Sequence, residues 1–155
     1  IGDVTERLER LRDHGTPAVL VDRNGADSGF SSVSVDDIAG GYLAARHLLE
    51  QGRRRIAYVG AQFEIRQVAD RLEGARRAVA EVDDATLEVI TAEGLTVLDG
   101  RKAGERILAR PSSSRPDGLF TVNDLMAVGV LQALVMTGAV KVPDDMALVG
   151  YDDID

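Results

Sequence analysis

Polar residues follow two short apolar runs late in the chain, in positions suited to binding a small molecule. Residues 120–122 lead directly into Asn123 and Asp124, where a helix-like pattern begins, and residues 148–151 lead into Asp152. Open parallel sheets bind their ligands at the edge formed by the carboxyl ends of their strands. Two polar strand ends in one sheet therefore predict a polar small-molecule site at that edge.

Four side chains, with one apolar neighbour, are candidates for this site. The Arg71 guanidinium can fork onto two oxygens, such as vicinal hydroxyls or a carboxylate; alternatively, Arg71 is a solvated helix residue. Asn123 can donate and accept, which suits a hydroxyl or a base edge, or it caps a helix, although Asp124 is the favoured cap. Asp152 accepts from hydroxyl donors or lies in a solvated turn. Leu95 follows a further strand and could form an apolar wall.

The elements that must position these residues alternate between short apolar strands and amphipathic helices. This alternation predicts an α/β fold with a parallel sheet flanked by helices. The loop at 23–32 is the candidate subdomain boundary, and the basic run at 53–55 is interpreted as a solvated turn. The predicted helices are 6–14, 38–51, 67–82, 99–109 and 125–137, and the predicted strands are 17–22, 33–35, 56–60, 87–91, 119–122 and 146–151.

Charge and composition exclude several classes of protein. The 155-residue chain has a net charge of -8, so by itself it is a poor DNA binder, because nucleic-acid surfaces need clustered positive charge. It has no cysteine, hence no disulfide or thiolate metal site. No apolar run approaches the length of a membrane span, and residues 1–7 lack the layout of a signal peptide. We expect no membrane association.

The motifs of catalysis and cofactor binding are missing as well. The sequence has neither the P-loop pattern nor the glycine fingerprint of dinucleotide sites, so we expect no cofactor. Neither His14 nor His47 lies near a plausible nucleophile, and there is no G-x-S-x-G elbow. The aspartates at 152, 153 and 155 lack the spacing of a calcium loop, so we expect no metal. A recognition site without catalysis remains.

Four segments resemble the effector-binding core of the LacI/GalR transcription regulators. They are DDIAGGYLAARHLLEQGRRRIAYVG at 36–60, RLEG at 71–74, NDLMAVG at 123–129 and GAVKVPDDMALVGYDD at 138–153. The resemblance implies a periplasmic-binding-protein-like fold of type I, with two α/β lobes joined by crossing strands. Residues 1–35 would then be the tail of the amino-terminal lobe, 36–152 the carboxyl-terminal lobe, and 153–155 the start of the crossover back. The chain is expected to be a fragment that lacks the helix-turn-helix headpiece.

The same resemblance implies a function and a set of contacts. Family members contact their effector at the positions of Arg71, Asn123 and Asp152, and an aromatic residue often stands at Leu95, where leucine argues against simple face stacking. The chain would be the effector-binding domain of a cytoplasmic, homodimeric regulator that senses a small molecule, a sugar or a nucleobase-like compound. DNA would be bound only through the headpiece. The alternatives are a solute-binding protein of a sugar transport system, and an enzyme using Asp124 or Asp152 as a base.

Overall fold

The computed structural model describes residues 4–23, 29–138 and 140–154, and its chain divides into two units, Ile1–Asp36 and Asp37–Asp155. The smaller unit holds helix α1 (Val4–Asp13) and the parallel strands β1 (Val19–Val21) and β2 (Ser31–Val33). The second strand thus begins and ends two residues earlier than the predicted 33–35. The predicted loop at 23–32 lies partly outside the described residues. The assignment of residues 1–35 and 36–152 to two different lobes stays a prediction.

The larger unit is built on a four-stranded parallel sheet in the order β4-β3-β5-β6. Its strands are β3 (Arg55–Gly60), β4 (Thr86–Thr91), β5 (Gly118–Thr121) and β6 (Ala147–Val149). The two central strands are almost wholly buried, as expected where helices cover both faces. The predicted parallel sheet flanked by helices is confirmed, but the last strand ends at Val149, so residues 150–153 form a loop beyond it.

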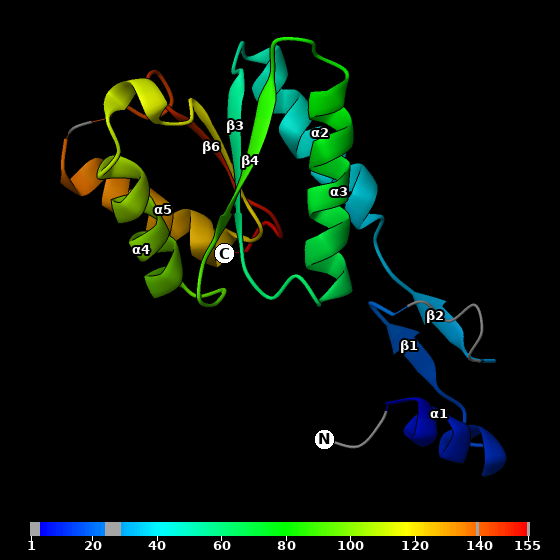
Figure 1. Ribbon diagram of the computed structural model, residues 1–155. Helices are drawn as coiled ribbons and strands as arrows, with labels where there is room; N and C mark the ends of the chain where they lie inside the picture. Colours follow the sequence, from blue (N-terminus) through cyan, green and yellow to red (C-terminus); the bar gives the residue numbers. More distant parts are fainter. Residues whose placement is uncertain (1–3, 24–28, 139, 155) are drawn as a thin grey trace. The chain divides into compact units, whose positions relative to one another are not determined.

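Two pairs of helices cover the sheet (Figure 1). Helix α2 (Asp37–Glu50) packs against α3 (Arg66–Ala80) on one face, and α4 (Val97–Leu108) packs against α5 (Asp124–Met136) on the other. The short 3-10 helix η1 (Ser112–Ser114) precedes β5. The contact between α2 and α3 requires glycine, because a Cβ at Gly41 would collide with the backbone carbonyl of Arg71. Within the described residues, no helix is both long and apolar enough to cross a membrane.

The core of the larger unit lies between the sheet and both helix pairs. Tyr58 and Phe120 are fully buried at its centre, with ring centroids 5.2 Å apart in an edge-to-face arrangement. The Tyr58 hydroxyl donates to the Val68 carbonyl at 3.0 Å, which ties the first turn of α3 to β3. The sheet and the start of α3 are therefore a rigid support for residues near the strand ends.

The basic run at 53–55 differs from our prediction of a solvated turn, because two of its arginines bind backbone carbonyls of other segments. Arg53 donates to the carbonyls of Pro143 (2.8 Å) and Asp144 (3.0 Å), and Arg54 donates to the Leu49 carbonyl (3.0 Å). These bonds fasten the loop before β6 and the end of α2 to the start of β3. These arginines lie at the amino ends of the strands, opposite the edge that the carboxyl ends form.

Candidate functional site

The carboxyl ends of β3, β5 and β6 meet at one edge of the sheet because the three strands are parallel and adjacent. The register places Val59 beside Thr121, and Phe120 beside Val149. The buried Thr121 hydroxyl lies within hydrogen-bond distance of the carbonyls of Asn123 (3.1 Å) and Val149 (3.2 Å), between which its one hydrogen is shared. This hydroxyl holds the two polar strand ends together, so the loops that follow them lie side by side.

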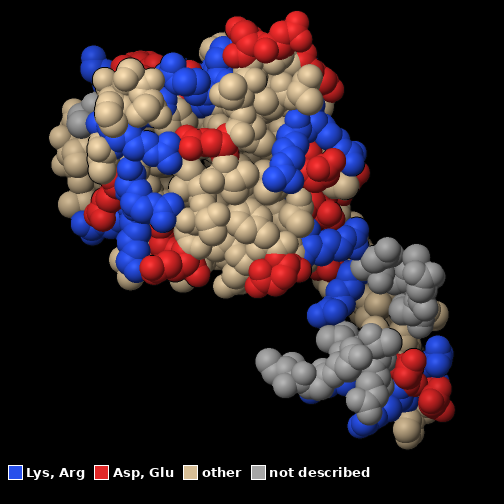
Figure 2. Space-filling model, viewed as in Figure 1, with Lys and Arg blue, Asp and Glu red and all other residues tan. Residues whose placement is uncertain are grey.

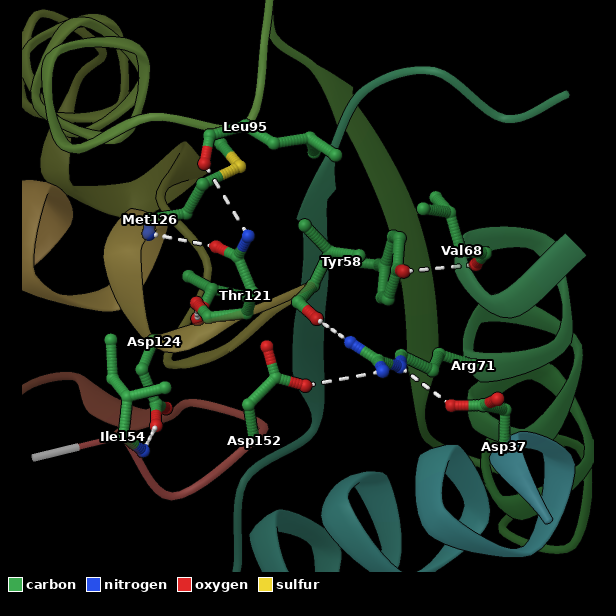
Figure 3. A network of polar contacts seen from close by, with 12 residues as sticks. Asp37, Tyr58, Val68, Arg71, Leu95, Thr121, Asp124, Met126, Asp152 and Ile154 are labelled. Atoms are coloured by element: carbon green, nitrogen blue, oxygen red, sulfur yellow. Dashed lines mark hydrogen bonds and ion pairs between the residues drawn. The ribbon is translucent and has the colours of Figure 1, made fainter. Parts of the chain in front are cut away.

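Arg71 connects three segments at this edge (Figure 3). Its Nε donates to Asp37 Oδ1 at 2.8 Å, its Nη1 donates to the Val122 carbonyl at 2.6 Å, and its Nη2 lies 3.1 Å from Asp152 Oδ1. The side chains of Arg71 and Asp37 are only 12% and 6% exposed, whereas that of Asp152 is 39% exposed. Arg71 is therefore not a solvated helix residue, and it joins the start of α2, the end of β5 and the loop after β6.

Tyr151 supports the guanidinium from one side. The Arg71 Cζ lies 3.8 Å from the centroid of the Tyr151 ring, within the range of a cation–π contact. The ring also approaches Phe120, with centroids 6.3 Å apart, and its hydroxyl lies against Gly40, where any side chain would collide with it. The orientation of Arg71 is thus fixed by packing as well as by hydrogen bonds.

Burial and charge shift the pKa values of these groups. Burial raises the pKa of the Asp152 carboxyl, an effect that Arg71 opposes and the nearby Asp124 reinforces. Burial also raises the pKa of Tyr151, as does the charge of Asp37. For Arg71, burial lowers the pKa, but the hydrogen bond to Asp37 and the charges of both carboxylates outweigh it and leave the pKa raised. Arg71 is a permanent cation held between two acids.

Asn123, and not Asp124, caps helix α5, which corrects our prediction. The Asn123 backbone is extended (φ -152, ψ 172), so its side-chain oxygen reaches the Met126 amide at 2.9 Å. Its Nδ2 donates to the Leu95 carbonyl at 3.3 Å. Asp124 is the first helical residue and instead accepts from the Ile154 amide at 3.0 Å. The Asn123 amide therefore joins the loop after β4 to the start of α5.

Leu95 lies beside Asn123 through its backbone, and its side chain is partly buried against the core. An apolar wall at Leu95 stays a prediction. The described residues contain no group of three or more histidine, cysteine, aspartate or glutamate side chains placed to hold a metal ion. Asp155, part of the acidic run considered above, lies outside them.

An open depression of about 480 Å³ lies at this edge, lined by the loop after β6 and the start of α5. Its lining residues are Asp124, Gly150, Tyr151, Asp152 and Asp153. Asp152 and Asp153 both have positive φ angles (103° and 56°), so the loop turns sharply there. Three of the five lining residues are aspartates, and Arg71 is connected to the depression through its ion pair with Asp152.

The structure thus brings the candidates to one edge. Arg71 and Asp152 form an ion pair, Asn123 directly follows the residue whose carbonyl Arg71 binds, and Asp124 shares the depression with Asp152. Sequence reasoning missed both Tyr151 as a support and Asp37 as a partner of Arg71. The aromatic residue beside a polar strand end was the available signal for Tyr151.

Known proteins share this arrangement of elements. Residues 45–155 match the model of the family described as "Periplasmic binding protein-like domain". The chain is 37% identical over 153 residues to the HTH-type transcriptional regulator GntR of Pseudomonas aeruginosa, covering 97% of this chain and 43% of that protein. It is 34% identical over 156 residues to the HTH-type transcriptional repressor PurR of Vibrio campbellii, covering 99% of this chain and 46% of that protein. The chain therefore spans less than half the length of these relatives.

A solved structure gives the same result. The crystal structure of a LacI family transcriptional regulator from Enterococcus faecium with bound ribose superimposes with a TM-score of 0.84 at 28% identity, over 98% of this chain and 55% of that one. These matches confirm the resemblance that the four sequence segments indicated.

Proposed function

The chain belongs to the periplasmic binding protein-like domain family, and from this premise we propose that it is the effector-binding part of a ligand-responsive transcription regulator. The effector would be a small molecule, either a sugar or a nucleobase-like compound. Both curated relatives are named as transcription regulators, and the similar Enterococcus protein is a regulator with bound ribose. These names favour a regulator over a transport protein or an enzyme.

The observation that carries the proposal is the position of Arg71. A guanidinium has five N–H groups, and the three partners of Arg71 use three of them. Several hydrogen-bonding groups therefore meet at one sheet edge. They are the two remaining N–H groups of Arg71, the second oxygen of Asp152 and the polar start of α5. Such a set suits a ligand with several hydroxyl or amide groups. We assign effector contacts to Arg71, Asn123 and Asp152, with Leu95 and Asp124 beside them.

Regulation would follow from the places where the chain enters and leaves the larger unit. We assign residues 1–35 to one lobe, 36–152 to the other and 153–155 to the returning crossover. Asp37 and Asp152 are both partners of Arg71; Asp37 is the first residue of the larger unit, and Asp152 precedes the crossover that we assign. An effector that engages Arg71 would favour one lobe orientation by a population shift. A coupling of about 1–3 kcal/mol changes DNA affinity roughly 5- to 150-fold.

DNA binding itself would belong to a helix-turn-helix headpiece outside this chain, and the regulator would act in the cytoplasm. The net charge of -8 opposes direct contact with phosphates. On the face shown in Figure 2, blue side chains gather at the left of the view, over α4, with red ones beside them, and the centre of the face is tan. Two cations of α4 are paired with acids, Lys102 with Glu93 and Arg101 with Glu105.

We further propose a homodimer formed through α5. The chain has no charged residue between Leu125 and Val140, and α5 is apolar around its whole circumference. One face packs on the sheet, while the opposite face leaves large apolar side chains 40–71% exposed, namely Leu125, Val128, Leu131, Val135 and Met136. A helix that is apolar all round is normally buried on all sides, which supports a partner at this face.

A thermal-shift screen of sugars and nucleobases tests the proposed function. A ligand at a hundredfold excess over its Kd stabilises the folded state by about 2.7 kcal/mol, which corresponds to a shift of several degrees. We expect at least one compound to raise the melting temperature, and Arg71→Lys to abolish the shift. Arg101→Lys, on the exposed face of α4, should retain it. A screen in which no compound stabilises the wild type would contradict the proposal.

A further inference from the structure

Asp37 is an unusual residue at the candidate site because it is a buried carboxylate that does not face the open depression. Among the described residues, only Asp37 and Thr121 are polar or charged and also buried. Its oxygen binds the Nε side of Arg71, whereas Asp152 binds the Nη2 end and lines the depression. Burying a charged carboxylate costs free energy of folding, so the presence of Asp37 beside Arg71 needs an explanation.

The charges around Arg71 do not leave it free to attract an anion. One guanidinium lies within 3.1 Å of two carboxylates, so the group formed by Arg71, Asp37 and Asp152 carries a net charge of -1. Asp124 and Asp153 line the same depression, and no lysine or arginine is among its described lining residues. A negatively charged ligand would therefore meet no unbalanced positive charge on this side of the site.

We propose that Asp37 sets the charge specificity of the effector site. By neutralising Arg71 from its buried side, Asp37 makes the site bind uncharged effectors and reject anionic ones, such as sugar acids and sugar phosphates. This inference rests on the proposed function and narrows the class of its effector.

The physical basis is that hydrogen bonding and net attraction depend on different properties of Arg71. Its remaining N–H groups can still donate to a hydroxyl or a carbonyl, because donation requires only free hydrogens in the right direction. An anion is repelled by the net charge of -1 on the group formed by Arg71, Asp37 and Asp152, and removing the charge of Asp37 brings that group to zero. Replacing Asp37 by asparagine keeps an acceptor for Nε and removes only the charge.

Calorimetric titration of the full chain with D-ribose and D-ribose 5-phosphate tests the proposal, because these probes differ by one phosphate. The comparison uses the wild type, Asp37→Asn, and the matched control Glu73→Gln, which also removes one negative charge from the molecule. Glu73 pairs with Arg77 on the exposed surface of α3. Asp37→Ser, which keeps a hydroxyl as an uncharged acceptor at this position, is the second variant if Asp37→Asn does not fold.

We expect Asp37→Asn to bind ribose 5-phosphate at least about tenfold more tightly than the wild type or Glu73→Gln. Its affinity for ribose should change by less than about threefold, and the gain should vanish in Asp37→Asn/Arg71→Ala. Equal phosphate affinity in Asp37→Asn and Glu73→Gln, or a gain that survives removal of Arg71, would overturn the inference. Either result leaves the proposed function standing if an uncharged compound stabilises the wild type in the screen.

Discussion

Removing Arg71 should destabilise the larger unit as well as weaken effector binding. Arg71→Ala leaves the Asp37 carboxylate buried at 6% exposure without its ion-pair partner, and it leaves the Val122 carbonyl without a donor. Loss of one member of a buried pair costs about 3–5 kcal/mol, and loss of the carbonyl hydrogen bond about 0.5–1.5 kcal/mol more. The pair with Asp152 adds little, because that carboxylate is 39% exposed and is screened by solvent. We expect a total loss of about 5 kcal/mol.

Urea denaturation followed by circular dichroism measures this loss. The double variant Arg71→Ala/Asp37→Asn should recover about 2 kcal/mol, because it removes the unpaired charge. Arg77→Ala, further along α3 in an exposed pair with Glu73, should change stability by less than about 0.5 kcal/mol. A loss below about 1 kcal/mol for Arg71→Ala, or no recovery in the double variant, would refute the reasoning.

Three further predictions concern the cap, the acid and the apolar helix face. Asn123→Ala should lower the free energy of unfolding by about 1–2 kcal/mol through loss of the cap on Met126, and Asn123→Asp should recover most of it; equal losses in urea titrations would contradict the capping role. Because burial raises the pKa of Asp152 above its ordinary 3.8, ionising it opposes folding: the penalty is absent below pH 3.8 and complete above the raised pKa. The free energy of unfolding of Asp152→Asn, relative to that of the wild type, should therefore rise as the pH increases from 3.8 to the raised pKa. A difference between the two proteins that stays constant from about pH 3 to 7 would contradict this prediction. Val128→Lys, on the exposed α5 face, should yield monomers in light scattering, whereas Leu43→Lys on α2 should not; a dimer that survives Val128→Lys would disprove the proposed interface.

The strand-end argument predicted, for a geometrical reason, that these residues share one edge of the sheet, and they do. Parallel strands end at one edge, so polar residues after β5 and β6 had to lie near each other once both strands were recognised. The contact between Arg71 and Asp152 follows from this arrangement together with the position of α3 after β3. Whether these residues bind an effector stays a prediction.

Local patterns could not resolve contacts that depend on the exact backbone. Asn123 and Asp124 are both good capping residues, and only the extended backbone of Asn123 decides between them. Tyr151 continued an apolar run and looked like part of a strand, but the strand ends at Val149. Beyond it, Gly150 lies against the Asp124 carboxylate too closely for a side chain.

Long-range partners were equally invisible in the sequence. Asp37 and Arg71 are 34 residues apart, and an aspartate at the start of a helix is so common that it indicates no distant partner. Arg53 belonged to a basic run typical of solvated turns, yet its acceptors are the backbone carbonyls of Pro143 and Asp144, 90 and 91 residues further along. No local pattern carries information about acceptors that far away.

We propose that the fork of Arg71 binds the effector at the carboxyl edge of the sheet. Calorimetric titration of the wild type and Arg71→Lys with the best compound from the thermal-shift screen tests it most directly, because lysine keeps the charge beside Asp37 but loses the planar fork. We predict that Arg71→Lys weakens binding by about 2–5 kcal/mol. An unchanged dissociation constant in a folded Arg71→Lys variant would show that the effector binds elsewhere.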